Sequence, residues 1–393
     1  MRQFISEMIE RFGGRQAGSA AEERAQDFLQ ERLKNVAHVE RHRFTEHLTA
    51  HFSSLKIFCW LYYLSLAAFD FSLYVSFIIA AINAVLFHGH FVSYRSWLDF
   101  LFKKHSSSNV IATIEPRKKA TSTLIFTAHI DSTPEFIWWY RLKNFGGFLT
   151  FIAGFAFTFW PFMLLAQMSM NMNTETVRAL YLVFSALAIP TLAFYFIHGK
   201  YTVAGAMDNL SGIAIITALA ESLVTKTGKS NKPVLQQTRV RVISFGSEEP
   251  GLKGSRAFVN DYRDTLRNEN AVIVNIDGIM KEEKLRIIFH EVNPAVTYPS
   301  WLVERLQAAF EENQLPPSRG IIAVGGTDAA SFALEKIPAA CIVGQTLYKL
   351  DPEYHTLLDL PEAVDEKALE SVLAILQSFA KNWDKSPPGS FDY

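Results

Sequence analysis

The chain has 393 residues, and its 38 Lys and Arg residues nearly balance its 39 Asp and Glu residues. This charge balance argues against a nucleic-acid-binding protein that relies on a basic surface, and against an acidic disordered chain. The two cysteines exclude a disulfide framework and a cysteine-rich zinc site, so any metal must be bound by His and carboxylate side chains.

Two helices are predicted at the start of the chain. Phe4, Met8 and Phe12 follow helical spacing, and a second helical pattern runs from residue 19 to residue 35. Ser19 followed by Glu22 is typical of a capping box at a helix start. The first residues are charged and contain neither an apolar core nor a cleavage site, so we expect no signal peptide.

Four hydrophobic stretches contain no Asp, Glu, Lys or Arg, namely residues 57–69, 71–87, 144–174 and 179–199. A membrane-spanning helix needs about 20 apolar residues. The last two stretches reach this length, and the first two reach it if residues 52–56 and 88–92 extend them. Helices buried in a soluble core are the alternative, but such helices normally keep a polar face. We therefore predict two transmembrane helical hairpins, which turn near Asp70 and near residues 171–176.

The charges that flank these stretches predict a cytoplasmic catalytic side. An even number of membrane crossings places all the polar segments on one side of the bilayer. Basic residues border the hydrophobic stretches on that side: Arg41, Arg43, Lys56, Arg95, Lys103, Lys104, Arg141, Lys143 and Lys200. The opposite turns offer only Asp70, Glu175 and Arg178. The positive-inside rule therefore favours an integral, multi-pass membrane protein whose polar part faces the cytoplasm.

The polar remainder alternates between strand and helix patterns. Strands are predicted at 110–114, 124–128, 240–245, 271–276, 321–324 and 339–343, and helices at 210–223, 255–268, 299–313 and 363–383. This alternation indicates an α/β fold with a layered sheet covered by helices on both faces. The predicted organisation is a catalytic domain built from residues 1–51, 96–143 and 200–393, interrupted by hydrophobic hairpins at 52–95 and 144–199.

Acidic and histidine side chains cluster where the predicted strands end. They are His129, Asp131, Asp208, Glu248, Glu249, Asp277, Asp328, His355 and Asp359. Taken singly, each fits an ordinary turn, a helix cap or a solvated acidic loop. Taken together they fit one site, because ligands of open α/β sheets bind at the carboxyl ends of the strands. Two histidines with several carboxylates are the ligands of a divalent metal pair, with zinc the first choice.

These residues stand in five ordered motifs, His129-Ile-Asp131, Asp208-Asn-Leu-Ser-Gly212, Glu248-Glu-Pro-Gly-Leu-Lys-Gly-Ser255, Asn275-Ile-Asp277 and Tyr354-His-Thr-Leu-Leu-Asp359. The set resembles the co-catalytic dizinc aminopeptidases (metallopeptidase family twenty-eight), whose relatives include glutamate carboxypeptidase, glutaminyl cyclase and the transferrin receptor. The segment GGRQAGSAAEERAQDFLQERL is similar to the opening helix of that family. The resemblance implies a mixed, mostly parallel sheet of the zinc-exopeptidase type.

The resemblance also implies a role for each residue. Asp208 would bridge two Zn²⁺ ions, or another divalent metal, and the Asp208–Asn209 peptide bond would be cis. His129 and Asp277 would complete one metal site, and Glu249 and His355 the other. Asp131 would orient His129. Glu248 would be the general base that activates a metal-bridging hydroxide. Asp328 and Tyr354 are candidates for lining the substrate pocket or supporting a ligand.

The implied function is a membrane-anchored aminopeptidase that hydrolyses N-terminal residues from peptides with a free N-terminus. This sequence departs from the family pattern in two places. The second hydrophobic hairpin lies between His129 and Asp208, which places the site near the membrane, and Ala329 stands where relatives often have histidine. A carboxypeptidase or another amide hydrolase of the same fold remains an alternative. A glutaminyl cyclase and a non-catalytic membrane receptor or scaffold are less favoured, because the complete ligand set and the base are present. Nothing in the pattern indicates an oligomeric state.

Overall fold

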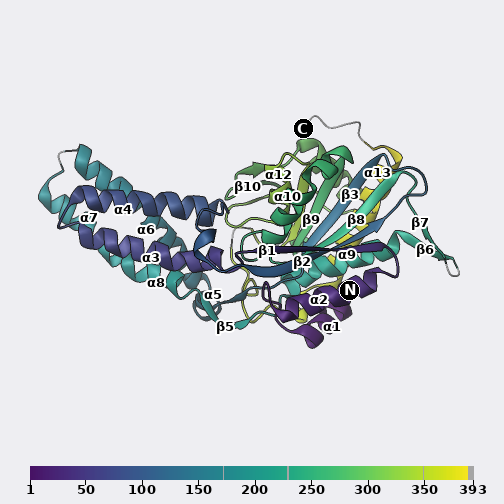
Figure 1. Cartoon of the computed structure of the whole chain (residues 1–393), viewed down its shortest axis with the longest axis horizontal. Coiled ribbons are helices and arrows are strands. Elements are labelled where there is room, and N and C mark those ends of the chain that lie inside the picture. The colour runs from purple at the N-terminus through teal and green to yellow at the C-terminus, as the bar shows by residue number, and fades with distance from the viewer. Residues whose placement is uncertain (171, 228–229, 348, 388–393) are drawn as a thin grey trace. The chain divides into compact units, whose positions relative to one another are not determined.

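The computed structural model describes residues 1–170, 172–227, 230–347 and 349–387 (Figure 1). The chain forms two compact units. Met1–Leu48, Lys104–Pro134 and Tyr201–Tyr393 make up the first, which we call the sheet unit. Thr49–Lys103 and Glu135–Lys200 make up the second, which we call the helical unit. The predicted hairpin segments 52–95 and 144–199 lie inside the two pieces of the helical unit.

The sheet unit is built on one large mixed sheet (Figure 1). Its strands are β1 (His38–Glu46), β2 (His105–Ile114), β3 (Ser122–His129), β8 (Thr238–Phe245), β9 (Ala271–Ile279), β10 (Arg286–Glu291), β11 (Val296–Thr297), β12 (Arg319–Ile322) and β13 (Ala339–Gly344). They lie in the order β1-β2-β8-β3-β9-β13-β10-β11, and β12 pairs with β10. The four central strands β8, β3, β9 and β13 run parallel, whereas β1, β2, β10 and β11 pair antiparallel. The mixed sheet is thus confirmed, and it is mostly parallel only at its centre.

Helices cover both faces of this sheet. They are α1 (Arg2–Phe12), α2 (Ala20–Leu33), α9 (Ser211–Ser222), α10 (Lys253–Asn268), α11 (Ser300–Glu312), α12 (Asp328–Leu334) and α13 (Glu366–Lys385). Phe126 of β3 contacts Phe379 of α13. Phe245 of β8 pairs in register with His129, three residues beyond Phe126, and therefore points to the other face. There it contacts Phe258 of α10 and Phe332 of α12. Both faces of the central strands are therefore buried, which explains their continuous apolar sequence.

Most of the predicted elements occur in the sheet unit, and the differences have physical causes. The strands β1, β10 and β11, the helix α12 and the small strand pair β6 (Val224–Thr227) and β7 (Ser230–Pro233) were not predicted. β1 is an edge strand with mostly polar residues, so it lacks the apolar pattern of a buried strand. Asp277 was expected just after a strand but lies within β9, because pairing with β13 continues past it to Ile279. Gly278, at a φ of 60°, allows the register shift at this point.

The helical unit contains hydrophobic helices at the positions of both predicted hairpins. Its helices are α3 (Ala50–Ala68), α4 (Leu73–Leu86, continued by a π-helical turn at Phe87–Val92), α5 (Ile137–Leu142), α6 (Asn144–Ser169), α7 (Thr174–Ala186) and α8 (Ala188–Tyr195). Three helical segments are long and apolar enough to cross a membrane, namely Leu73–Val92, Asn144–Ser169 and Thr174–Tyr195. α3 is not among them, because His51 and Lys56 lie in its first turns. The helix of residues 174–195 is interrupted after Ala186, where α7 ends. Pro190 has no N–H group, so the carbonyl of Ala186 lacks its i+4 donor.

Polar groups of the helical unit pair in its interior, while apolar side chains point outward. The Tyr62 hydroxyl donates to the carbonyl of Phe184 at 2.6 Å. Ser65 Oγ donates to the carbonyl of Ser76 at 2.7 Å and accepts from Trp160 Nε1 at 2.7 Å. Outward-facing side chains include Phe71, which is 90% exposed, and Ile189, which is 72% exposed. The rest of the interior is apolar and includes Phe58, Phe157 and Trp160, so both the inside and much of the outside of this unit are hydrophobic.

One buried carboxylate near the C-terminus links α13 to the start of β8. Asp384 accepts hydrogen bonds from the backbone N–H groups of Gln236, Gln237 and Thr238 at 2.7, 2.8 and 2.8 Å. We expect Asp384→Ala to cost about 2 kcal/mol because these donors lose their acceptor. The midpoint of thermal unfolding in detergent should fall by about 2–4 °C.

Asp264→Ala is the matched control for this stability measurement. The Asp264 side chain is 86% exposed, and its contacts with arginines are 3.9 Å long. Its removal should change the unfolding free energy by no more than about 0.5 kcal/mol. An equal fall in the midpoint for both variants would show that Asp384 does not anchor this turn.

Candidate metal centre

Five predicted ligands from distant parts of the chain meet at the carboxyl end of the central strands. His129 is the last residue of β3 and Asp277 lies near the end of β9. Glu249 follows β8, Asp208 precedes α9, and His355 lies in the loop before α13. The parallel arrangement of the central strands is what brings these ends to one edge.

Asp208 lies between the two histidines. One of its carboxylate oxygens is 3.1 Å from His129 Nε2, and the other is 3.2 Å from His355 Nε2. His129 Nε2 is also 3.7 Å from Asp277 Oδ1, and His355 Nε2 is 3.3 Å from Glu249 Oε2. A single carboxylate therefore borders two separate groups of nitrogen and oxygen atoms, which is the geometry of a bridging ligand.

Two groups of side chains are close enough to hold a metal ion each. His129, Glu248 and Asp277 form one group, and Asp208, Glu249 and His355 form the other, with all ligand atoms of a group within 4.8 Å of one another. Glu248 belongs to the first group by distance, although it was predicted to be the base and not a ligand. Its Oε2 lies 3.9 Å from His129 Nε2, farther than the oxygens of Asp208 and Asp277.

The electrostatics of the site favour bound cations. Burial and then the neighbouring carboxylates raise the pKa values of Glu248 and Glu249 well above their usual range. Burial opposes the charge of His129, yet the surrounding carboxylates hold its pKa well above the ordinary value. Glu249 Oε1 is buried and has no hydrogen-bond partner among the described residues. Two imidazoles and a surplus of carboxylate oxygens, one of them unpaired, fit a pair of zinc ions.

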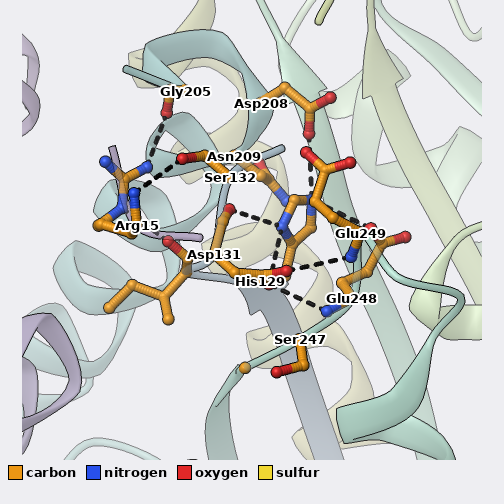
Figure 2. Close-up of polar contacts among 12 residues, drawn as sticks. Arg15, His129, Asp131, Ser132, Gly205, Asp208, Asn209, Ser247, Glu248 and Glu249 are labelled. Carbon is orange, nitrogen blue, oxygen red and sulfur yellow. Dashed lines mark hydrogen bonds and ion pairs between the residues drawn. The ribbon is translucent and has the colours of Figure 1, made fainter. Parts of the chain in front are cut away.

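Asp131 holds the loop between β8 and α10 that carries Glu248 and Glu249, which we call the glutamate loop (Figure 2). Its carboxylate accepts the backbone N–H of Glu248 at 3.0 Å and that of Glu249 at 3.1 Å. His129 Nδ1 lies 3.2 Å from the backbone carbonyl of Asp131 and 3.5 Å from its carboxylate. The predicted contact with His129 is therefore present, but the carboxylate makes its shortest hydrogen bonds to the glutamate loop.

The turn that carries Asp208 is fixed by two further side chains. The Asp208–Asn209 peptide bond is cis, as the resemblance implied. Asn209 Nδ2 donates to the carbonyl of Ile276 at 2.8 Å. Asp359 accepts the N–H groups of Met207 and Asp208 at 2.6 and 3.1 Å, and burial raises the pKa of its carboxyl to about 7. Asp359 closes the fifth motif, so the sequence contained the signal for its role.

Arg15 is a site-supporting residue that the residue-by-residue prediction missed. Its side chain is fully buried and donates to the carbonyls of Ile130 and Ala204 at 2.7 and 2.8 Å, and to that of Gly205 (Figure 2). It therefore ties the segment after His129 to the segment before Asp208. Burial lowers the pKa of Arg15 to about 10, so it stays protonated at neutral pH. Its position in the GGRQAGS segment was the only available signal.

The two remaining candidates lie beside the ligands. Asp328 is the first residue of α12 and is fully buried, and burial raises the pKa of its carboxyl to about 7. The ring of Tyr354 stacks on the imidazole of His355 with centroids 3.9 Å apart. Neither belongs to the two groups of metal-binding atoms described above.

The chain is similar to known proteins both in sequence and in structure. The model of Peptidase family M28 matches residues 182–380. No curated protein matches the chain. The structure is similar to a zinc aminopeptidase from Bacillus subtilis, with a TM-score of 0.56 and 16% identity over 100% of this chain and 95% of the other.

Two further structures are similar. An aminopeptidase from Aneurinibacillus sp. strain AM-1 has a TM-score of 0.55 and 16% identity over 100% of this chain and 97% of the other. A glutaminyl cyclase from Porphyromonas gingivalis has a TM-score of 0.55 and 13% identity over 97% of this chain and 96% of the other. At these identities the likeness concerns the fold, which is that of the zinc exopeptidases.

Proposed function

Because the chain belongs to Peptidase family M28, we propose that it is a membrane-anchored dizinc aminopeptidase that removes N-terminal residues from peptides. The observation that carries this proposal is the carboxylate of Asp208, whose two oxygens face His129 and His355 at 3.1 and 3.2 Å. This arrangement supports a two-metal site and not a single ion.

The proposed ligands are His129, Asp208 and Asp277 for one ion, and Asp208, Glu249 and His355 for the other. When bound, two zinc ions supply a Lewis acid that polarises the scissile carbonyl and lowers the pKa of water. Glu248 accepts a proton from the attacking water and returns it to the leaving amine. Asp131 keeps Glu248 in place through the backbone N–H of that residue.

The substrate class is tested by turnover of the full chain in detergent. Aminoacyl-anilides should be cleaved and N-blocked peptides should not, because an exopeptidase requires a free α-amine. A chelator should abolish cleavage, and added zinc should restore it. Cleavage of blocked peptides alone would contradict the aminopeptidase assignment and favour another amide hydrolase of this fold.

Glutaminyl cyclisation is the second candidate, since a glutaminyl cyclase is among the similar structures. The presence of both groups of metal-binding atoms favours hydrolysis. A peptide with N-terminal glutamine separates the two reactions, because hydrolysis releases free glutamine whereas cyclisation releases ammonia. Ammonia as the sole small product would replace the aminopeptidase proposal.

The membrane part of the proposal rests on the composition of the helical unit. Three of its helical segments are long and apolar enough to span a bilayer, and large apolar side chains face outward. α3 pairs with α4 as a hairpin, and the ammonium of its exposed Lys56 lies 5.7 Å from the ring of Tyr195, a cation–π contact. We assign two hairpins to the bilayer and the sheet unit to the cytoplasmic side.

This anchoring predicts the behaviour of the chain in cell fractions. The protein should remain in the membrane pellet after alkaline carbonate extraction, because the hydrophobic hairpins are held by lipid and not by surface charge. In intact cells a protease added outside should leave the sheet unit uncut, and detergent should expose it. Release by carbonate would contradict the anchor, and cutting of the sheet unit from outside would reverse its orientation.

A further inference from the structure

The loop between β8 and α10 is held by an unusual run of hydrogen bonds. Four consecutive backbone N–H groups, from Gly246 to Glu249, each donate to a buried side chain. Gly246 donates to Asn109 Oδ1 at 3.0 Å, and Ser247 donates to Glu22 Oε1 at 2.7 Å. The next two, Glu248 and Glu249, donate to the carboxylate of Asp131 as described above.

Glu22 is the most distant of these partners along the chain. It lies in the first turn of α2, and its carboxylate is 2% exposed. Besides Ser247 N–H it accepts the Ser247 hydroxyl at 3.2 Å, the Ser107 hydroxyl at 2.9 Å and Gly18 N–H at 2.7 Å. The capping-box expectation for Glu22 is therefore wrong in one respect, since its carboxylate accepts from Gly18 and not from Ser19. Its two bonds from Ser247 reach the glutamate loop, whereas the Ser107 hydroxyl belongs to β2.

Ser247 has an uncommon backbone conformation where it contacts Glu22. Ser247 has a φ of 58°, in the left-handed region that side-chain-bearing residues rarely adopt. The preceding Gly246 has no room for a side chain, because an added Cβ would lie 2.6 Å from the Ser108 carbonyl oxygen and 2.8 Å from Glu22 Oε1. The chain thus turns tightly against Glu22 immediately before Glu248.

We propose that Glu22 is a positioning residue for Glu248. By fixing the backbone of Ser247 it sets the direction in which the loop presents the Glu248 carboxylate to the metal-binding atoms. Asp131 fixes the next two N–H groups, so Glu22 and Asp131 act as adjacent clamps on one turn. The catalytic part of this inference rests on the proposed peptidase function. The hydrogen bonds from Ser247 to Glu22 can be tested without any enzymatic activity.

The test compares Glu22→Ala with Glu23→Ala in the full chain. Glu23 is the neighbouring residue of the same helix, and its carboxylate pairs with Arg41 at 3.1 Å and makes no bond to the glutamate loop. Steady-state kcat and KM, bound zinc per chain and amide hydrogen exchange of peptides covering residues 246–249 are measured for both. In Glu22→Ala we expect kcat to fall about 10–100-fold with KM and zinc nearly unchanged. Exchange should accelerate in the 246–249 segment but not in α11.

Three results would overturn the proposal: a kcat equal to that of Glu23→Ala, a fall in kcat that only follows loss of zinc or folded protein, or unchanged exchange in the 246–249 segment. If the unsubstituted chain cleaves no peptide, the proposed function fails, and the exchange measurement alone decides whether Glu22 holds the loop. If Glu22→Ala does not fold, Glu22→Asp replaces it. That side chain keeps the carboxyl group but is one methylene shorter, so the Ser247 N–H loses its close acceptor and the same fall in kcat is expected.

Discussion

Glu248→Gln is expected to remove most peptide hydrolysis while both metal ions stay bound. Glutamine keeps the size of the side chain but cannot accept a proton, so turnover loses its general base. General acid–base catalysis of this kind contributes about 10²–10⁴-fold, and kcat should fall by that factor. KM should change little, because the amide still fills the same volume. The measurement pairs steady-state kinetics on an aminoacyl-anilide with elemental analysis of the purified protein.

Metal analysis of this variant distinguishes a general base from a metal ligand at position 248. Glu248 lies in the same group of atoms as His129 and Asp277, so the geometry also permits it to bind metal. Glu249→Gln is the matched control, since it changes the adjacent residue and should release metal along with activity. If Glu248→Gln also loses metal, Glu248 is a ligand, and if it turns over normally, it is not the base.

Asp208→Asn is expected to cost the site its metal. The carboxamide is nearly isosteric, but one of its two heavy atoms is now an N–H donor that faces an imidazole nitrogen and offers no lone pair to a metal. Changes outside the ligand shell already cost 10–100-fold in metal affinity, so loss of a bridging ligand should exceed about 100-fold. Dialysis against a weak chelator followed by elemental analysis should find at least one of the ions missing, with hydrolysis lost as a consequence.

The exposed Asp264→Asn serves as the control for this dialysis and should retain both ions. Circular dichroism should show that Asp208→Asn is folded, which separates loss of metal from loss of structure. Although burial opposes its charge, the imidazoles of His129 and His355 hold the pKa of Asp208 well below its usual range. The carboxylate is thus ionised at any pH used for the assay. Full metal content in Asp208→Asn would exclude a bridging role.

The sequence predicted the central strands because apolar strands with polar ends are strong local signals, whereas the five ligand positions were implied by the resemblance of the ordered motifs to a known family. Leu124, Ile125 and Phe126 form a short apolar run typical of a buried strand, and His129 follows at its end. The same signals were absent from β1, whose residues are mostly polar, and from the bulge at Gly278 that draws Asp277 into β9. Local patterns carry no information about pairing partners, so edge strands and register shifts escape them.

The supporting residues were harder to predict than the ligands. Arg15 and Glu22 act through backbone groups that lie more than a hundred residues away along the chain. Nothing in the type of residue at 130, 204 or 247 shows that its backbone needs a partner, because every residue has the same N–H and carbonyl groups. Such contacts are defined by the tertiary fold alone, so only the structure could identify them.

The assembly of the site from distant segments has a practical consequence for anyone who wishes to make a smaller version of this protein. The stretch that the family model matches, residues 182–380, begins after His129, Asp131, Arg15 and Glu22. A fragment trimmed to that stretch would carry Glu248 and four of the five ligands, yet lack one imidazole and the buried groups that shape the turns. We expect such a fragment to have no catalytic activity. A shorter version that keeps activity must include the first two helices together with β3.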